Sequence, residues 1–172
     1  AEVTYTDSNG KEMSRLFANE AQIGIGAEVV RRTTQRRKRV GGLIAYGMHT
    51  LSLVFRYKSP SMAIVVDGKR EMTRKVMGLA IGNGAITAGG MRLTPKASLN
   101  DGLLDILIID EQNVSKRLRS FARIYSGDHV EMPEFKYVRG TSITVMSDAP
   151  VSVSADGEFL GFLPCQNYER DF

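Results

Sequence analysis

The sequence lacks tryptophan, contains a single cysteine, Cys165, and has no long run of apolar residues. One cysteine cannot form a disulfide within the chain. Together with only two histidines, His49 and His129, it cannot supply the usual closed ligand set of a zinc site. Because no run of about 18 apolar residues occurs, we expect no transmembrane helix. The first residues also lack the layout of a signal peptide, so we expect a cytoplasmic protein.

The 172 residues, 42% of them hydrophobic, suffice for one core but not for two domains of average size. The net charge of +4 comes from one segment, because residues 31–39 hold six basic residues and the rest of the chain then carries −2. Such a run is either a solvated helix face or a surface for an anionic membrane. No aromatic residue lies within it, so nucleic acid is not expected as a partner. The membrane candidates are Arg36, Arg37, Lys38 and Arg39.

Most of the chain has the short, alternating apolar pattern of β-strands. Hairpins are predicted from 3–5 to a strand that runs toward Phe17, from 62–66 to 76–81, and from 151–153 to 159–162; a buried strand is predicted over 103–109. The pairs Asp67-Gly68 and Asp156-Gly157 are typical of two-residue hairpin turns. These patterns predict a mainly β (α+β) fold, an antiparallel β-sandwich with about three short helices.

The three helices are predicted between the strands. The first runs from Ala27 through the basic run to Gly41-Gly42, and the second covers 43–57, where apolar residues recur at helical spacing. The third is a short amphipathic helix marked by Leu118, Phe121, Ala122 and Tyr125.

Three glycine- and aspartate-rich segments are candidates for chemistry. Gly82-Asn83-Gly84 and the following Gly89-Gly90 lack the ending of a P-loop, and they predict either a tight connection or a backbone that approaches another group. Asp101 lies in a turn with free main-chain carbonyls beside it. This turn either holds Mg²⁺ with few protein ligands or is a plain turn. Asp156-Gly157-Glu158 either forms a simple hairpin turn or holds a general base just past that turn.

Taken in order along the chain, these motifs resemble the lipid-kinase family of diacylglycerol, sphingosine and ceramide kinases, in particular the soluble bacterial diacylglycerol kinases. The segments that carry the resemblance are 15–19, 24–30, 82–84, 89–97, 100–105, 127–129 with Pro133, and 156–158 followed by Pro164. The resemblance implies that residues 1–172 form a single domain, the β-sandwich at the C-terminal end of the family, which is shared with NAD kinases. It also implies that the N-terminal ATP-binding domain, with its Gly-Gly-Asp-Gly-Thr loop, lies outside this chain.

The resemblance further implies an ATP-dependent kinase that transfers the γ-phosphate to the hydroxyl of diacylglycerol or a similar lipid. Glu158 would be the general base, supported by the turn of Asp156 and Gly157. Asn83, Gly89 and Gly90 would border the cleft between the domains. Asp101, with the carbonyls of Ser98 and Leu103, would hold Mg²⁺.

The implied partners are the lipid, ATP, the N-terminal domain, an anionic membrane at its inner face, and a second copy of the chain. The chain alone is then expected to be inactive, because it has no phosphate-binding loop. Two alternatives stay open. One is a non-catalytic lipid- or membrane-binding module, and the other is a nucleotide kinase similar to the NAD kinases.

Overall fold

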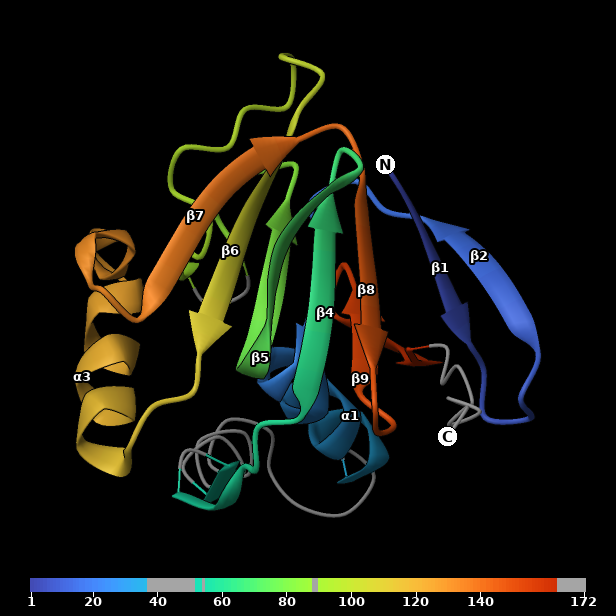
Figure 1. Ribbon diagram of the computed structural model, residues 1–172, viewed down its shortest axis with the longest axis horizontal. Coiled ribbons are helices and arrows are strands. Elements are labelled where there is room, and N and C mark those ends of the chain that lie inside the picture. The colour runs from blue at the N-terminus through green and yellow to red at the C-terminus, as the bar shows by residue number, and fades with distance from the viewer. Residues whose placement is uncertain (37–51, 54, 88–89, 164–172) are drawn as a thin grey trace.

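The computed structural model describes residues 1–36, 52–53, 55–87 and 90–163 (Figure 1). In chain order the elements are β1 (Glu2–Thr6), β2 (Glu12–Leu16), β3 (Glu20–Gly24), α1 (Ile25–Arg36), β4 (Ser61–Val66), β5 (Lys69–Gly82), β6 (Leu104–Asp110), α3 (Val114–Ile124), the 3₁₀-helix η2 (Asp128–Glu131), β7 (Phe135–Gly140), β8 (Ile143–Ser147), β9 (Ser152–Ala155) and β10 (Glu158–Phe162). The strand pairings among these residues are antiparallel. The predicted mainly β fold is therefore confirmed.

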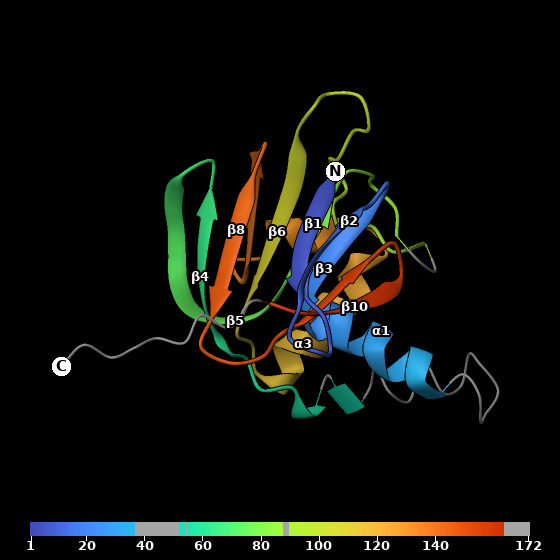
Figure 2. The same ribbon diagram turned by 90° about the vertical axis from the view of Figure 1, so that its right-hand side faces the viewer.

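Strand β5 connects the two layers of the sandwich because it pairs in both. Its first half pairs with β4, which in turn pairs with β8, and its second half pairs with β3 and β6. The register shifts between Val76 and Gly78, where the strand passes from one layer to the other. From β3 the larger sheet continues through β9, β10, β1 and β2, and from β6 it continues to β7. Figure 2 shows β4 and β8 on one side of the molecule and β1 and β3 on the other.

The main core lies between these layers because the strands alternate in the way that the sequence predicts. On β4, Met62, Ile64 and Val66 are buried, whereas the residues between them are partly exposed. A second apolar cluster covers the opposite face of β5 and β6, and it includes Leu107 and Phe135. Both faces of β6 are thus covered, which explains its nearly continuous apolar run. Each side chain buried in this way contributes about 1.5–3 kcal/mol.

Helix α1 confirms the first predicted helix as far as Arg36. The remaining membrane candidates, Arg37, Lys38 and Arg39, lie outside the described residues, as does most of the helix predicted over 43–57. Helix α3 confirms the third, and it begins after Asn113, whose side chain accepts a hydrogen bond from the N–H of Lys116. No helix in the described ranges is long and apolar enough to cross a membrane.

The orientation of α3 differs from that of an ordinary amphipathic helix, which buries its apolar side. Leu118, Phe121 and Tyr125 are exposed, and the buried residues are Arg117 and Ser120. The reason is a set of polar anchors. Arg117 donates to the carbonyl oxygens of Gln112 and Tyr57, at 2.7 and 3.0 Å. Ser120 donates to the side-chain oxygen of Gln112 at 2.8 Å. These bonds, with Ile124 packed against the second apolar cluster, turn the side of α3 that carries Arg117 and Ser120 inward.

Candidate functional site

The Asp156-Gly157 turn joins β9 to β10, and both residues have positive φ, 46° and 76°. This is the backbone of the two-residue turn that favours Asp-Gly. The Asp156 carboxylate accepts hydrogen bonds from three successive backbone N–H groups at 2.7, 2.9 and 3.0 Å, those of Ala18, Asn19 and Glu20. Burial acts to raise the pKa of Asp156, but these three donors outweigh it and hold the pKa below its usual value. Asp156 therefore fixes the turn to the segment before β3.

Glu158, the first residue of β10, faces outward. Its side chain is 64% exposed, and its carboxylate forms an ion pair of 2.7 Å with the guanidinium of Arg15 on β2. The hydrogen bond to Glu158 raises the pKa of Arg15. An exposed carboxylate at the end of a fixed hairpin is accessible to a hydroxyl group that approaches from outside. The two carboxylates of the motif thus differ in role: one is bonded to the backbone, and the other is open to solvent.

Asn83 is bonded to the same segment as Asp156. Its side-chain amide donates to the carbonyl of Ala18 at 2.9 Å, and its backbone N–H donates to the carbonyl of Asn19 at 2.8 Å. A Cβ at Gly84 would overlap the side-chain oxygen of Asn19, so this close connection requires glycine. The structure therefore brings Asn83 and Asp156 together. Gly90 is exposed, with φ of 81°, and Gly89 lies outside the described residues.

Glu20 is a buried carboxylate beside this turn that the sequence analysis did not select. It is 6% exposed, and it accepts hydrogen bonds from the side chains of Thr87 and of Gln22, the latter at 2.8 Å. Burial raises the pKa of Glu20. Arg15 and Asn19 were missed as well, although they lie in a segment that carries the family resemblance. Only their place in that segment could have singled them out, because the residues between them, Leu16, Phe17 and Ala18, are apolar.

The carboxylate of Asp101, the predicted Mg²⁺ ligand, makes contacts within the protein. One oxygen of Asp101 accepts the N–H of Leu103 at 3.0 Å, and the other pairs with the guanidinium of Arg139. Arg139 also reaches the fully buried Asp105 at 3.4 Å. The described residues contain no cluster of three metal-ligating side chains. Asp101 and the exposed Ser98 fit Mg²⁺ only if main-chain carbonyls and water complete the coordination.

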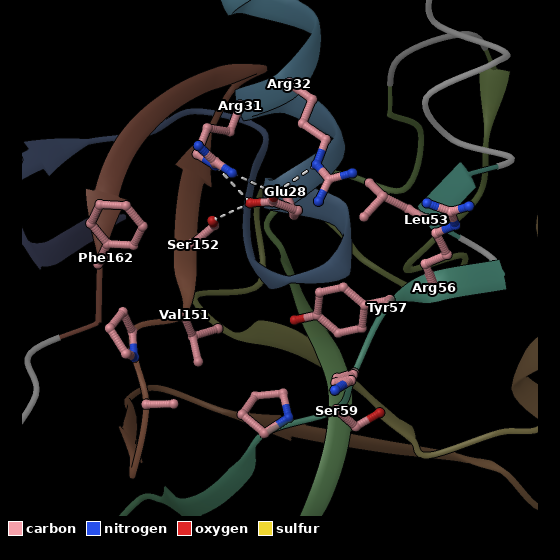
Figure 3. Close-up of a pocket in the computed structure, with 14 residues that line it drawn as sticks. Glu28, Arg31, Arg32, Leu53, Arg56, Tyr57, Ser59, Val151, Ser152 and Phe162 are labelled. Carbon is pink, nitrogen blue, oxygen red and sulfur yellow. Dashed lines mark hydrogen bonds and ion pairs between the residues drawn. The ribbon is translucent and has the colours of Figure 1, made fainter.

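A cavity of about 510 Å³ lies beside α1, at the opposite end of β3 from the Asp156 turn (Figure 3). In the wall of this cavity, Glu28 accepts hydrogen bonds from Arg31, Arg32 and Ser152, at 2.6–2.8 Å. Burial opposes ionisation of Glu28, but these donors lower its pKa to about 2. The hydroxyl of Tyr57 points into the same space, and burial raises the pKa of Tyr57 to about 12.

The lining of this cavity combines cations with apolar groups. Its basic residues are Arg31, Arg32, Arg56 and Lys58, and its apolar residues are Leu53, Pro60, Ala149, Pro150, Val151 and Phe162. With Glu28 as the single acid among them, the lining favours an anionic group next to an apolar one. Sequence reasoning missed this cavity because its residues come from segments far apart in the chain.

Comparison with known proteins identifies the family. Residues 19–169 match the model of the YegS C-terminal NAD kinase beta sandwich-like domain. The chain belongs to this family. A protein named diacylglycerol kinase from Mycobacterium tuberculosis is 30% identical over 160 residues, which are 93% of this chain and 50% of that protein. A diacylglycerol kinase from Staphylococcus saprophyticus is 28% identical over 90% of this chain and 50% of its own length. The relationship to bacterial diacylglycerol kinases that the motifs predict is therefore confirmed.

Solved structures show the same fold. A crystal structure from Bacillus anthracis superposes with a TM-score of 0.61 at 21% identity, and it covers 96% of this chain and 51% of that one. A diacylglycerol kinase from the same organism gives a TM-score of 0.52 at 17% identity, over 92% and 46% of the two chains. The chain thus spans about half the length of the relatives it matches.

Proposed function

We propose that this chain is the substrate-side half of an ATP-dependent lipid kinase, with diacylglycerol or a similar lipid as the phosphate acceptor. The observation that carries the proposal is the Asp156-Gly157-Glu158 hairpin, in a chain whose curated relatives are named diacylglycerol kinase. The hairpin holds one exposed carboxylate on a turn that four hydrogen bonds fix to the segment before β3. A general base needs this combination of access and fixed position.

In the proposed reaction the lipid hydroxyl attacks the γ-phosphorus of ATP. The new O–P bond forms as the bond from the γ-phosphorus to the bridging oxygen breaks, and ADP leaves. The hydroxyl proton passes to the carboxylate of Glu158, which must first move out of its ion pair with Arg15. Because phosphoryl transfer depends mostly on positioning and on stabilisation of charge, one well-placed carboxylate is a sufficient contribution from this half.

Several features support the proposal without belonging to the reaction centre. Asn83 joins the glycine-rich connection to Ala18 and Asn19, the residues to which Asp156 also bonds. The phosphates of ATP would be bound by an N-terminal domain carrying the Gly-Gly-Asp-Gly-Thr loop. Mg²⁺, if held by Asp101 with the carbonyls of Ser98 and Leu103, would order the 98–103 loop.

The test is transfer of labelled γ-phosphate from ATP to a panel of acceptors, by the full-length protein that contains this chain and by the chain alone. The panel holds diacylglycerol, phosphatidylglycerol, a sphingoid base, ceramide and NAD. We expect the full-length protein to label a lipid and the chain alone to label none. Labelling of NAD but of no lipid would replace the proposal with a nucleotide kinase. Labelling of no acceptor would favour a module that only binds lipid or membrane.

A further inference from the structure

Helix α3 presents a row of apolar side chains to solvent. We call the row the apolar stripe, and it consists of Val114, Leu118, Phe121 and Tyr125 with exposed fractions of 36%, 44%, 36% and 49%. Spacings of four, three and four residues place these side chains along one side of a helix. The rings of Phe121 and Tyr125 meet edge to face with centroids 6.0 Å apart, which orders the end of the stripe.

The stripe is uncovered because α3 attaches to the fold through a different side, which carries Arg117, Ser120 and Ile124. Arg117 and Ser120 make the inward hydrogen bonds described above, and their side chains are buried. Figure 1 places α3 at one edge of the molecule, beside β6 and β7. Four neighbouring apolar side chains at such an edge form a candidate site for a partner or a membrane.

The charge of α3 indicates what the partner is. The helix carries four basic residues, Lys116, Arg117, Arg119 and Arg123, and no acidic one. Arg119 and Arg123 are exposed and one helical turn apart, and within the described chain neither has an ion-pair partner. The helical period of about 100° per residue places both arginines well over 100° around the axis from the stripe, with the small residue Ala122 between the two rows. The exposed arc of α3 therefore runs from the apolar stripe, through Ala122, to a basic row.

We propose that this side of α3 docks on an anionic lipid membrane. The apolar stripe would enter the boundary between head groups and acyl chains, and the two arginines would meet lipid phosphates, as in helices that lie in the plane of a membrane. A second copy of the chain fits less well, because α3 paired with α3 offers no carboxylate to these arginines. This inference rests on the proposed function, since a kinase acting on diacylglycerol must reach a membrane. It assigns the contact to α3, not to the basic run at 31–39.

The absence of tryptophan from the chain allows a direct test. In the Phe121→Trp variant the only tryptophan lies in the stripe, whereas in Leu16→Trp it lies on β2, at a residue that is 76% exposed. With vesicles of equal parts phosphatidylcholine and phosphatidylglycerol at low salt, we expect emission of Phe121→Trp to shift to shorter wavelength and emission of Leu16→Trp to stay unchanged. Equal behaviour of the two variants would overturn the proposal.

A binding measurement gives the size of the effect. Replacing Leu118 and Phe121 together with serine should weaken co-sedimentation with the same vesicles by about tenfold or more, because two apolar contacts are lost. Replacing Arg119 and Arg123 with glutamine should weaken it by roughly tenfold at low salt and by less at high salt. The control with the same change of net charge replaces Lys11 and Lys69 with glutamine, and it should bind like the original chain.

These substitutions alter exposed side chains, so an unchanged unfolding midpoint should show that the variants fold. Undiminished vesicle binding by the serine variant would refute docking through α3. If the chain instead forms dimers that the serine variant abolishes, the stripe joins two copies and the proposal is wrong. Vesicle binding needs neither ATP nor turnover, so it is independent of the kinase assay. In the full-length protein, the serine variant should lose activity on diacylglycerol in vesicles but keep it on short-chain diacylglycerol in solution.

Discussion

The two Asp-Gly turns of the molecule have nearly the same backbone but different surroundings. Asp67-Gly68 joins β4 to β5 and Asp156-Gly157 joins β9 to β10, with φ of 46° at both aspartates and 75° and 76° at the glycines. Both carboxylates accept backbone N–H groups of a neighbouring segment: Asp67 accepts those of Thr141 and Ser142, and Asp156 accepts three. The aspartate is thus a structural residue in both turns.

What differs is the residue that follows each turn. Lys69 follows the first, at the edge of the smaller layer. Glu158 follows the second and faces outward, on the hairpin whose Asp156 bonds to Asn19, to which Asn83 also bonds. The turn alone therefore carries no information about function. The proposed chemistry depends on the glutamate and on its neighbours, so matched substitutions in the two turns separate chemistry from structure.

The largest expected effect is on catalysis. Glu158→Gln removes the proposed base, so we expect phosphorylation of diacylglycerol by the full-length protein to fall by about 100-fold or more. Lys69→Gln changes the equivalent residue of the other turn and should leave the rate unchanged. A steady-state assay with both variants is the measurement. Turnover of Glu158→Gln at the original rate would remove Glu158 from the mechanism.

The next effect is on stability, and it should be similar in both turns. Gly157→Ala and Gly68→Ala each place a Cβ in open space but at a φ that alanine rarely adopts. We expect each to lower the free energy of unfolding by about 1–2 kcal/mol, as measured by urea denaturation. A cost at one turn only would mean that the two backbones are not equivalent in solution.

Loss of the turn aspartates should also destabilise the fold. Asp156→Ala leaves three backbone N–H groups without their acceptor. Because water can accept some of these hydrogen bonds instead, we expect the free energy of unfolding to fall by about 1 kcal/mol. Asp67→Ala should act in the same direction. Thermal unfolding of both variants checks this, and Lys11→Ala, on an exposed turn, serves as the reference for an ordinary surface substitution.

The smallest effect is on the dependence of stability on pH. Hydrogen bonds from Thr141 and Ser142 lower the pKa of Asp67, and backbone donors lower the pKa of Asp156 against the effect of burial. Both contributions are therefore complete above the unfolded-state pKa of 3.8, and they are lost as pH falls through the lower folded-state values. Below pH 3.8 the unfolding midpoint should fall more steeply for the original chain than for a variant with both aspartates changed to asparagine. Parallel curves would contradict these shifts.

Much of the fold could be predicted because its signals are local. Alternation on β4 and the Asp67-Gly68 pair lie within a few residues of each other, and the hairpin follows from them. The side of α3 that faces the sheet could not be predicted, because it depends on the bond from Arg117 to the carbonyl of Tyr57, 60 positions away. A buried arginine on the inner side of an amphipathic helix has no signature in the local pattern.

The site shows the same limit. The sequence identifies Asp156, Glu158 and Asn83, but not that Asp156 and Asn83 bond to one segment, because that requires contacts over 65 positions or more. It suggests Asp101 as a cation ligand without indicating that Arg139 pairs with it. The cavity beside α1 is still harder to foresee, because its walls come from residues near 30, 56 and 150.

The measurement that tests the central claim most directly compares phosphate transfer to diacylglycerol by Asp156→Asn and Glu158→Gln, each expressed per folded molecule of the full-length protein. The account predicts that Asp156→Asn lowers the folded fraction but keeps most of the rate of each folded molecule. It predicts that Glu158→Gln folds normally and transfers almost no phosphate. An active Glu158→Gln variant, or a folded Asp156→Asn variant without activity, would contradict the division of roles between the two carboxylates.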